Sequence, residues 1–259
     1  MPTVRELEKW LDKRILKELS EPWDNDGLQV CADLDTPITR AIAALDVTSG
    51  ALNLAQTVGA QIIVTHHPII FEPLRRVTAE LPAARLILQA AARGVSLFAC
   101  HTRLDAMEGG VNDCLCALLG LRDTFSFGGG CGRIGSLESP VESAAFAAAV
   151  GHALDTNNVS GVCPRAYVRR VAVLGGSGKS FFADAVSAGA DTFLTGEVSH
   201  STLLDARELG INLICATHYC TEAVVIPVIA RVIKEGFGDI EVFEYYEKEV
   251  FKDVNLIGN

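Results

Sequence analysis

Short apolar runs recur along the chain, and segments with a helical pattern separate them. The runs are rich in β-branched residues and lie at 40–46, 61–65, 95–100, 171–174, 192–195 and 211–216. The helical patterns lie at 82–93, 111–119, 180–188 and 201–209. Strands that are apolar along their whole length are buried on both faces, and their alternation with helices is typical of parallel sheets. The sequence therefore predicts an α/β fold whose sheets are largely covered by helices.

The same order of elements occurs twice, at an offset of 130 residues. The residues that coincide at this offset are Arg40 with Arg170, Gly59 with Gly189, and Thr65 with Thr195. A second pair of segments starts at Gly94 and Gly210, and each reads glycine, apolar strand, then His-x-x-x-carboxylate. This pseudo-two-fold repeat predicts two similar α/β lobes, an N-terminal one at 1–125 and a C-terminal one at 165–259. A Gly-rich and helical linking segment, 126–164, joins them.

Four of the six histidines lie at the carboxyl ends of predicted strands, namely His66, His67, His101 and His218. Ligands of α/β proteins collect at that edge of the sheet. Asp105 and Glu222 each follow a histidine by four residues, the spacing that places two side chains on one face of a helical turn. A strand cap bonded to a backbone carbonyl explains one such histidine but not four.

Imidazoles combined with carboxylates, without paired thiolates, suit Zn, Mn, Fe or Ni. Five or six ligands of this kind exceed the three or four that one zinc ion needs. They suit two ions bridged by a carboxylate, as in two-metal hydrolases. Because His66 and His67 are adjacent and project differently, each is expected to serve a different ion.

The segment TGEVSH, 195–200, occupies the place in the second copy that THH has in the first. Its Glu197 and His200 are candidates for a role beside the metal or in substrate binding. The alternative is a helix start that Glu197 caps. Catalytic residues stay unassigned at this point, with His101, Glu197 and His200 as the candidates.

Two loops have more than one interpretation. LGGSGKS, 174–180, resembles a phosphate-binding loop, but Val173 stands where a Walker A motif needs glycine. Tight packing of a strand-to-helix turn, or an anion cradle that includes Lys179, both fit this loop. PWDNDGLQV, 22–30, contains an Asx-Gly cluster that predicts a turn. The turn is either anchored by Trp23 alone or lines the mouth of the site.

Composition and charge narrow the class of protein. The net charge of −10 disfavours nucleic acid as a main partner, because phosphate binding needs a basic surface. No run approaches the ~18 apolar residues of a membrane-spanning helix, and the first 20 residues lack the apolar core of a signal peptide. The eight cysteines contain no C-x-x-C pair. We therefore expect a cytoplasmic protein without membrane contact, whose thiols are reduced and mostly serve as small apolar side chains.

Several segments together resemble the NIF3-like family, also written DUF34, whose members carry a dinuclear metal centre. The matching pieces, in chain order, are WDNDGLQV, ALDVTSG, IVTHHPIIF, HTRLDAMEGGVND, VLGGSG, TGEVSH and ATHYCTE. The resemblance covers nearly the whole chain. It implies two divalent metal ions per chain in a cleft between the two lobes. The ligands that it implies are His66, His67, Asp105, His218 and a bridging Glu222. It also implies a toroidal homohexamer, a trimer of dimers.

The chain departs from the family pattern at three positions. Arg103 stands where Asn is usual, Cys220 where Ala is frequent, and Lys179 where a small residue is typical. The resemblance therefore implies an extra cation near the cleft that would alter anion binding. The larger inserted domain of some members is absent from this sequence.

Members of the family are often labelled GTP cyclohydrolase 1 type 2 homolog. The ligand set and the resemblance favour a metal-dependent hydrolase, with GTP cyclohydrolase-like chemistry included, that acts on a small molecule through a water whose pKa the ions lower. No segment indicates a guanine-binding site. Two alternatives fit the same residues. One is a carrier or cofactor-assembly protein for a metal such as iron. The other is a regulatory or scaffold protein whose metals are structural.

Overall fold

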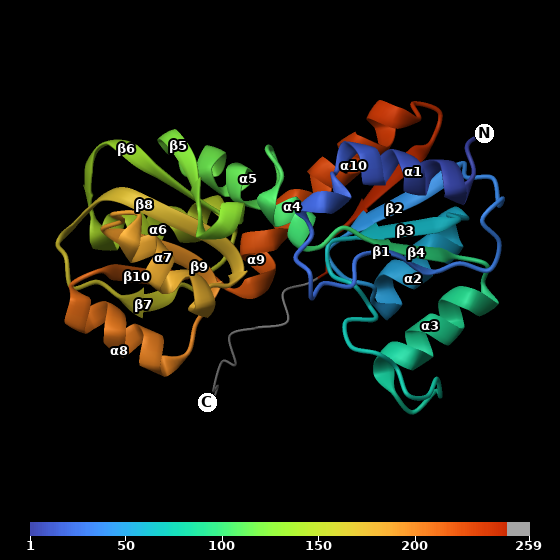
Figure 1. Ribbon diagram of the computed structural model, residues 1–259, viewed down its shortest axis with the longest axis horizontal. Helices are drawn as coiled ribbons and strands as arrows, with labels where there is room; N and C mark the ends of the chain where they lie inside the picture. The colour runs from blue at the N-terminus through green and yellow to red at the C-terminus, as the bar shows by residue number, and fades with distance from the viewer. Residues whose placement is uncertain (248–259) are drawn as a thin grey trace, which may run out of the picture. The chain divides into compact units, whose positions relative to one another are not determined.

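Two β-sheets organise residues 1–247, the part of the chain that the computed structural model describes. Each sheet belongs to its own compact unit. The first unit contains residues 1–110 and 225–247, and the second contains 111–224 (Figure 1). The α/β class predicted from the sequence is confirmed. The last twelve residues of the predicted C-terminal lobe, 248–259, lie outside the described residues. None of the described helices combines the length and the apolar character needed to cross a membrane.

The first sheet has the strand order β1-β4-β3-β2-β11. Its strands are β1 (Gly27–Val30), β2 (Arg40–Ala44), β3 (Ile62–Thr65), β4 (Ser96–Ala99) and β11 (Glu241–Tyr245). All are parallel except β1, which runs antiparallel to β4. Ala44, Thr65 and Ala99 stand side by side in the register. The segments that follow β2, β3 and β4 therefore leave the sheet at one edge.

Alternate residues of the first sheet bury their side chains on opposite faces. Ile42, Ile63 and Leu97 belong to the apolar cluster beneath α2 (Ser49–Val58) and α3 (Pro82–Ala92). The other face is covered by α1 (Val4–Arg14) and α10 (Ile226–Gly236), as Figure 1 shows. Burial of each fully buried aliphatic side chain stabilises the folded state by about 1.5–3 kcal/mol. This two-sided burial explains why the strands are apolar throughout.

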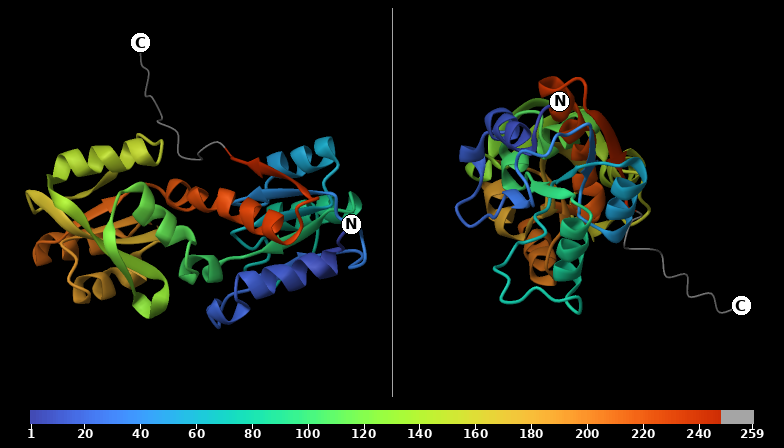
Figure 2. Two further views of the ribbon diagram at one scale, coloured as in Figure 1. Left: turned by 90° about the horizontal axis from the view of Figure 1, so that it is seen from above. Right: turned by 90° about the vertical axis from the view of Figure 1, so that its right-hand side faces the viewer.

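Helix α10 brings a late segment of the chain into the first unit. It lies beside α1 (Figure 2), where the Trp10 indole N–H donates to the Val232 carbonyl at 2.8 Å. A Cβ at Gly236 would stand 2.5 Å from the Trp10 ring, so the close approach depends on this glycine. The division into units thus differs from the lobes expected at 1–125 and 165–259. The reason is that the apolar face of α10 packs on the first sheet.

The second sheet has the strand order β5-β6-β8-β9-β10-β7. Its strands are β5 (Arg122–Phe127), β6 (Gly132–Glu142), β7 (Ser160–Val162), β8 (Tyr167–Ser177), β9 (Thr192–Glu197) and β10 (Asn212–Cys215). Strands β8, β9 and β10 are parallel, and the others are antiparallel to their neighbours. The segment 126–164, expected to link two lobes, instead supplies β6, β7 and α6 (Ser143–Ala153) to this unit.

Both faces of the second sheet are also covered. Val173, Leu194 and Ile214 stand in register and pack with residues of α5 (Val111–Leu118), α6 and α9 (His218–Glu222). Their sequence neighbours Phe193 and Leu213 pack on the opposite face with α7 (Phe182–Ser187) and α8 (His200–Leu209). The short 3₁₀ turns of the two units are Lys17–Leu19, Gly128–Gly130, Lys179–Phe181 and Ala223–Val225.

The two units share one succession of elements, in agreement with the repeat in the sequence. Each has three parallel strands that are neighbours in chain order, followed by a helix of five residues. That helix is α4 (Thr102–Ala106) in the first unit and α9 in the second. Thr65 and Thr195, which coincide at the offset of 130, both lie in the middle strand of the three.

Candidate metal centre

The first unit brings three imidazoles together at the strand-end edge of its sheet. His66 and His67 follow β3, and His101 follows β4. Their ring centroids lie 4.9 Å (His66 to His67), 5.2 Å (His66 to His101) and 5.6 Å (His67 to His101) apart. One ring nitrogen of each lies within 4.8 Å of one ring nitrogen of both others. Three of the four predicted strand-end histidines thus form a cluster within the first unit.

Each of these rings has its Nδ1 bonded to an oxygen. The acceptors are the Cys100 carbonyl for His66 (3.1 Å), Asp46 for His67 (2.8 Å) and Asp24 for His101 (2.8 Å). A carbonyl or carboxylate oxygen cannot donate, so Nδ1 carries the proton and the neutral ring has its lone pair on Nε2. Metal-ligating histidines are held in this way, with the second nitrogen donating to a carboxylate or carbonyl. The tautomers therefore match those of metal ligands.

The side chain of Asp24 is buried and stays ionised. Burial raises the pKa of its carboxyl group, but hydrogen bonds from the His101 ring and from Thr102 outweigh this effect and lower the pKa to about 2. The Thr102 backbone N–H donates at 3.0 Å and its hydroxyl at 2.6 Å. The 22–30 loop is therefore more than an isolated turn, because its aspartate orients a histidine of the cluster.

Asp105 on α4 approaches His66 rather than His101. Its Oδ1 lies 3.7 Å from His66 Nε2, longer than a hydrogen bond. His101 precedes the helix and has φ −88° and ψ −109°, so it lies outside the helical register in which residues i and i+4 share a face. The expected chelating pair of His101 and Asp105 is therefore replaced by a facing pair of His66 and Asp105.

The second unit supplies a histidine and a carboxylate on α9. His218 Nε2 lies 3.1 Å from Glu222 Oε2, as expected for residues four apart in a helix. The His218 Nδ1 donates to Glu197 Oε1 at 3.1 Å. His218 thus has the same tautomer as the three histidines of the first unit. Its Nε2, the lone-pair nitrogen, faces a carboxylate.

Glycines of the LGGSGKS loop make room for this pair. A Cβ at Gly176 would stand 2.1 Å from Glu222 Oε1 and 3.1 Å from His218 Nε2. Gly176 also has φ +67°, which disfavours other residues, and its N–H donates to the Thr221 hydroxyl at 3.0 Å. A Cβ at Gly178 would stand 2.3 Å from Thr195 Oγ1, while Lys179 is exposed. These contacts support the tight-packing interpretation of the loop.

The other candidates from the sequence are placed as follows. Glu197 orients His218, and Ser199, not Glu197, is the N-cap of α8, so the helix-cap interpretation of Glu197 is wrong. His200 is exposed at the first residue of α8. Burial raises the pKa of the Cys100 thiol to about 12, against the lowering effect of nearby Arg103. Cys100 is therefore a protonated core thiol, and only its carbonyl serves the cluster.

Arg103 points into the core of the first unit. Its side chain is fully buried and pairs with Asp12 at 2.8 Å and with Asp26 at 3.0 Å. It also donates to the Ala99 carbonyl at 3.3 Å and stands over the Phe98 ring at 5.3 Å. Two carboxylates neutralise its charge. The extra cation expected near the site is thus part of the packing of this unit.

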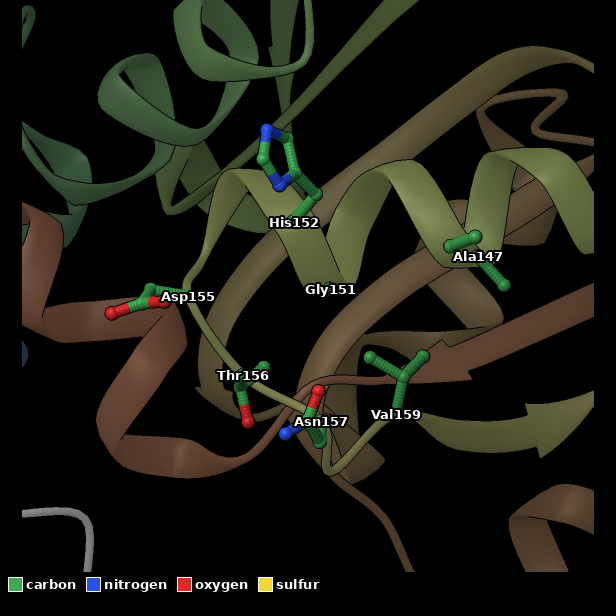
Figure 3. Close-up of a pocket in the computed structure, with 8 residues that line it drawn as sticks. Ala147, Gly151, His152, Asp155, Thr156, Asn157 and Val159 are labelled. Atoms are coloured by element: carbon green, nitrogen blue, oxygen red, sulfur yellow. The ribbon is translucent and has the colours of Figure 1, made fainter.

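Two cavities border the loop that follows α6. One, of about 570 Å³, is lined by residues including His152, Asp155 and Asn157 (Figure 3). The other, of about 430 Å³, shares Asn157 and reaches Glu197 and His218. A volume of about 300–1,000 Å³ is usual for small-molecule sites. The second cavity therefore offers space for a small molecule beside one of the candidate ligands.

Sequence reasoning missed the role of Asp46 and did not assign one to Asp24. Asp46 is the second residue after β2, as His67 is the second after β3, so the rule that polar residues gather at strand ends would have found it. Asp24 is 77 residues from His101, and no local pattern connects the two.

The donor set fits divalent cations. Four imidazoles have their lone pair on Nε2, and two of these nitrogens face the carboxylates Asp105 and Glu222. Nitrogen and oxygen donors without thiolates suit Zn, Mn, Fe or Ni. The types of donor atom in both units therefore suit such ions.

Comparison with known proteins gives consistent matches over most of the chain. The family model described as Duf34/NIF3 (NGG1p interacting factor 3) matches residues 2–249. A protein of Clostridium perfringens named GTP cyclohydrolase 1 type 2 homolog is 29% identical over 240 residues, which are 86% of this chain and 88% of that protein. One of the same name from Streptomyces coelicolor is 32% identical over 236 residues, 86% of this chain and 82% of that protein. A solved structure of a hypothetical protein from Staphylococcus aureus has a TM-score of 0.89 at 25% identity, covering 96% of this chain and 98% of its own.

Proposed function

Because the chain belongs to the Duf34/NIF3 family, we propose that it is a metal-dependent hydrolase that binds two divalent ions. The proposed ligands are His66, His67 and Asp105 of the first unit, and His218 and Glu222 of the second. The observation that carries this proposal is the common tautomer of the histidines, each with Nδ1 bonded to an acceptor oxygen. Metal-ligating histidines almost always donate their second ring nitrogen in this way, and the proposed histidine ligands of both units do so.

Neither unit has enough donors for two ions by itself. The first unit supplies three of the proposed ligands and the second supplies two, whereas one zinc ion already takes three or four. Under the proposal, residues of both units would therefore hold the two ions, Glu222 among them. Zn, Fe, Mn or Ni each suit these donors.

Bound divalent ions polarise carbonyl and phosphoryl oxygens and lower the pKa of water. Residues of the chain have distinct roles around them. Asp46 and Glu197 hold His67 and His218 in the ligating tautomer. His101 is proposed to accept a proton at Nε2, since the ionised Asp24 at its Nδ1 stabilises the resulting imidazolium. His200, exposed at the start of α8, is left without a role in the reaction.

The substrate class of the proposal is a small molecule with a carbonyl, amidine or phosphoryl centre. The cavity of about 430 Å³ beside His218 supports a small-molecule substrate. Relatives are named GTP cyclohydrolase 1 type 2 homolog, so GTP is the first compound to assay. We also propose a cytoplasmic location and a toroidal homohexamer, from the sequence resemblance. Light scattering of the purified protein, which gives its molar mass, tests the hexamer.

Metal content per chain, measured by mass spectrometry after anaerobic purification, tests the proposal. About two ions per chain are expected for the wild type, and a loss of at least one ion for Glu222→Ala. Glu208→Ala, on the exposed side of α8, is the matched control and should keep both ions. A wild type without stoichiometric metal would contradict the dinuclear centre.

Turnover by the metal-loaded protein then separates an enzyme from a carrier. The metal-loaded wild type is assayed against GTP and against simple phosphoesters and amides. His101→Gln is expected to keep two ions and lose turnover, because it removes the proton-accepting nitrogen and leaves the proposed ligands. Rapid transfer of both ions to a chelator, together with no turnover, would instead favour the metal carrier.

A further inference from the structure

Two exposed aromatic side chains stand beside the histidine cluster of the first unit. Trp23 is 61% exposed and Phe71 is 49% exposed. The ring centroid of Trp23 lies 6.0 Å from that of Phe71 and 6.1 Å from that of His101. The Phe71 and His101 centroids are 6.0 Å apart. The planes of the three rings meet edge to face, at 65°, 78° and 82°.

The loops that carry these two rings are tied to each other. The Asn25 side-chain amide donates to the Ile70 carbonyl, and the Ile70 N–H donates to the Gln29 side chain at 3.0 Å. Gln29 in turn donates to the Asn25 carbonyl at 2.6 Å. Two hydrogen bonds therefore join the segment after Trp23 to the residue before Phe71, and the third holds that segment in shape. This arrangement holds the rings in place without burying them.

The segments that carry Trp23 and Phe71 also carry residues of the candidate metal centre. Asp24 orients His101, and Phe71 ends the segment that begins with His66 and His67. The second tryptophan, Trp10, contrasts with Trp23, because its N–H bonds to a helix carbonyl and its ring packs on Phe237 at 6.4 Å. Packing of the unit thus accounts for Trp10 but leaves Trp23 largely in water.

We propose that Trp23 and Phe71 bind a planar heterocyclic ring of a small molecule beside His101, and we call this pair of side chains the aromatic clamp. Because the two rings meet at 65°, the heterocycle would stack on the exposed face of one ring and leave the other in edge contact. Base-on-aromatic stacking tolerates many rings, because every heterocyclic base has a π-face. Two side chains are too few for a stable protein interface, which buries about 1,200–2,000 Å². The clamp adds to the proposed function the class of substrate that the hydrolase would take. Binding of the ring by the clamp does not depend on the proposed hydrolase activity, whereas turnover of the bound molecule does.

Tryptophan emission provides a direct readout of the clamp. The chain has two tryptophans, so Trp10→Phe leaves Trp23 as the single emitter. Guanosine, adenosine and cytidine are the planar probes, and ribose is the non-planar control. For Trp10→Phe, we expect the nucleosides to quench the emission in a saturable way and ribose not to quench it. For the wild type, we expect the same pattern with a smaller fractional quenching, because Trp10 also emits. The wild type covers the case in which Trp10→Phe folds poorly.

Substitutions at Phe71 test the geometry. Phe71→Ala should weaken nucleoside binding about tenfold, equivalent to about 1.4 kcal/mol, whereas Phe71→Tyr should retain it. Phe125 on β5 is the matched control, because it is also 49% exposed but lies in the second unit. Phe125→Ala should leave the affinity unchanged. The clamp is refuted if no nucleoside quenches more than ribose, or if Phe71→Ala binds like Phe125→Ala.

Metal content measured on the same samples separates this inference from the proposed function. Nucleoside binding by a protein without stoichiometric metal would support the clamp and contradict the dinuclear centre. Two ions per chain with no nucleoside binding would contradict the clamp and leave the metal proposal standing.

Discussion

At the scale of single residues, the site depends on the atoms that hold the candidate ligands rather than on the ligands alone. Every histidine of the two sets donates its Nδ1 proton to an oxygen, and three of the four acceptors are carboxylates. Carboxylates behind imidazoles fix the ring orientation and raise the basicity of the ligating nitrogen. Substitution of these supporting residues should therefore affect metal binding without removing a ligand.

Gly176→Ala is expected to abolish metal binding by the second unit. The new Cβ would stand 2.1 Å from Glu222 Oε1, so the carboxylate must move away from His218. Gly120→Ala is the control, because Gly120 has a similar φ of +66° and open space around its Cβ position. Both variants share the backbone strain of about 1–2 kcal/mol. Mass spectrometry of bound metal should show a loss for Gly176→Ala alone, and equal metal content in the two variants would contradict the role of the glycine.

Asp24→Asn is expected to destabilise the metal-free protein by about 1–3 kcal/mol at neutral pH, because buried donors lose a charged acceptor. The folded-state pKa of about 2 lies below the value near 3.9 of an unfolded aspartate. The stabilising contribution of the Asp24 carboxylate is therefore complete above the unfolded-state pKa of about 3.9 and is lost as the pH falls through the folded-state pKa of about 2. Urea unfolding at several pH values should show the wild-type advantage shrinking between about pH 4 and pH 2. A pH-independent difference would contradict the ionised carboxylate.

At the scale of elements, strand ends and short helices carry the site, while buried ion pairs hold those elements. Arg103 is the clearest case, because it joins α4 to α1 through Asp12 and to the segment before β1 through Asp26. The backbone carbonyls of Ile15 and Ala99 also accept hydrogen bonds from Arg103, at 3.1 and 3.3 Å. The position of α4, and with it Asp105, depends on this network.

Arg103→Met should lower the free energy of unfolding by about 3–5 kcal/mol, because it leaves buried carboxylates without their partner. Arg122→Met is the matched control, since the Arg122–Glu138 pair is exposed and worth about 0–1 kcal/mol. Denaturant unfolding followed by tryptophan emission reports the first variant, because Trp10 and Trp23 both lie in the first unit. Circular dichroism follows the second variant. Costs of similar size for the two variants would contradict the structural role of Arg103.

At the scale of the whole molecule, metal binding should link the stabilities of the two units. A ligand that binds only the folded state stabilises it by about 2.7 kcal/mol at a hundredfold excess over Kd. Added divalent metal should therefore raise the unfolding temperature of the first unit, as read by tryptophan emission. Glu222→Ala, although in the second unit, should reduce this increase if both units hold the same ions. An unchanged increase would show that the first unit binds metal alone.

The sequence by itself determined the strands, their apolar character and the histidines at their ends. It also determined the pairing of His218 with Glu222, because residues four apart in a helix face each other whatever surrounds them. The tertiary structure decided the rest. It separated His101 from Asp105, joined α10 to the first sheet, turned Arg103 into the core and placed Gly176 against Glu222. The physical reason is the separation along the chain over which the interactions act. Periodicity and spacing report interactions within a turn or a strand, whereas the contact between Asp24 and His101 spans 77 residues and forms only when the strands of the sheet assemble.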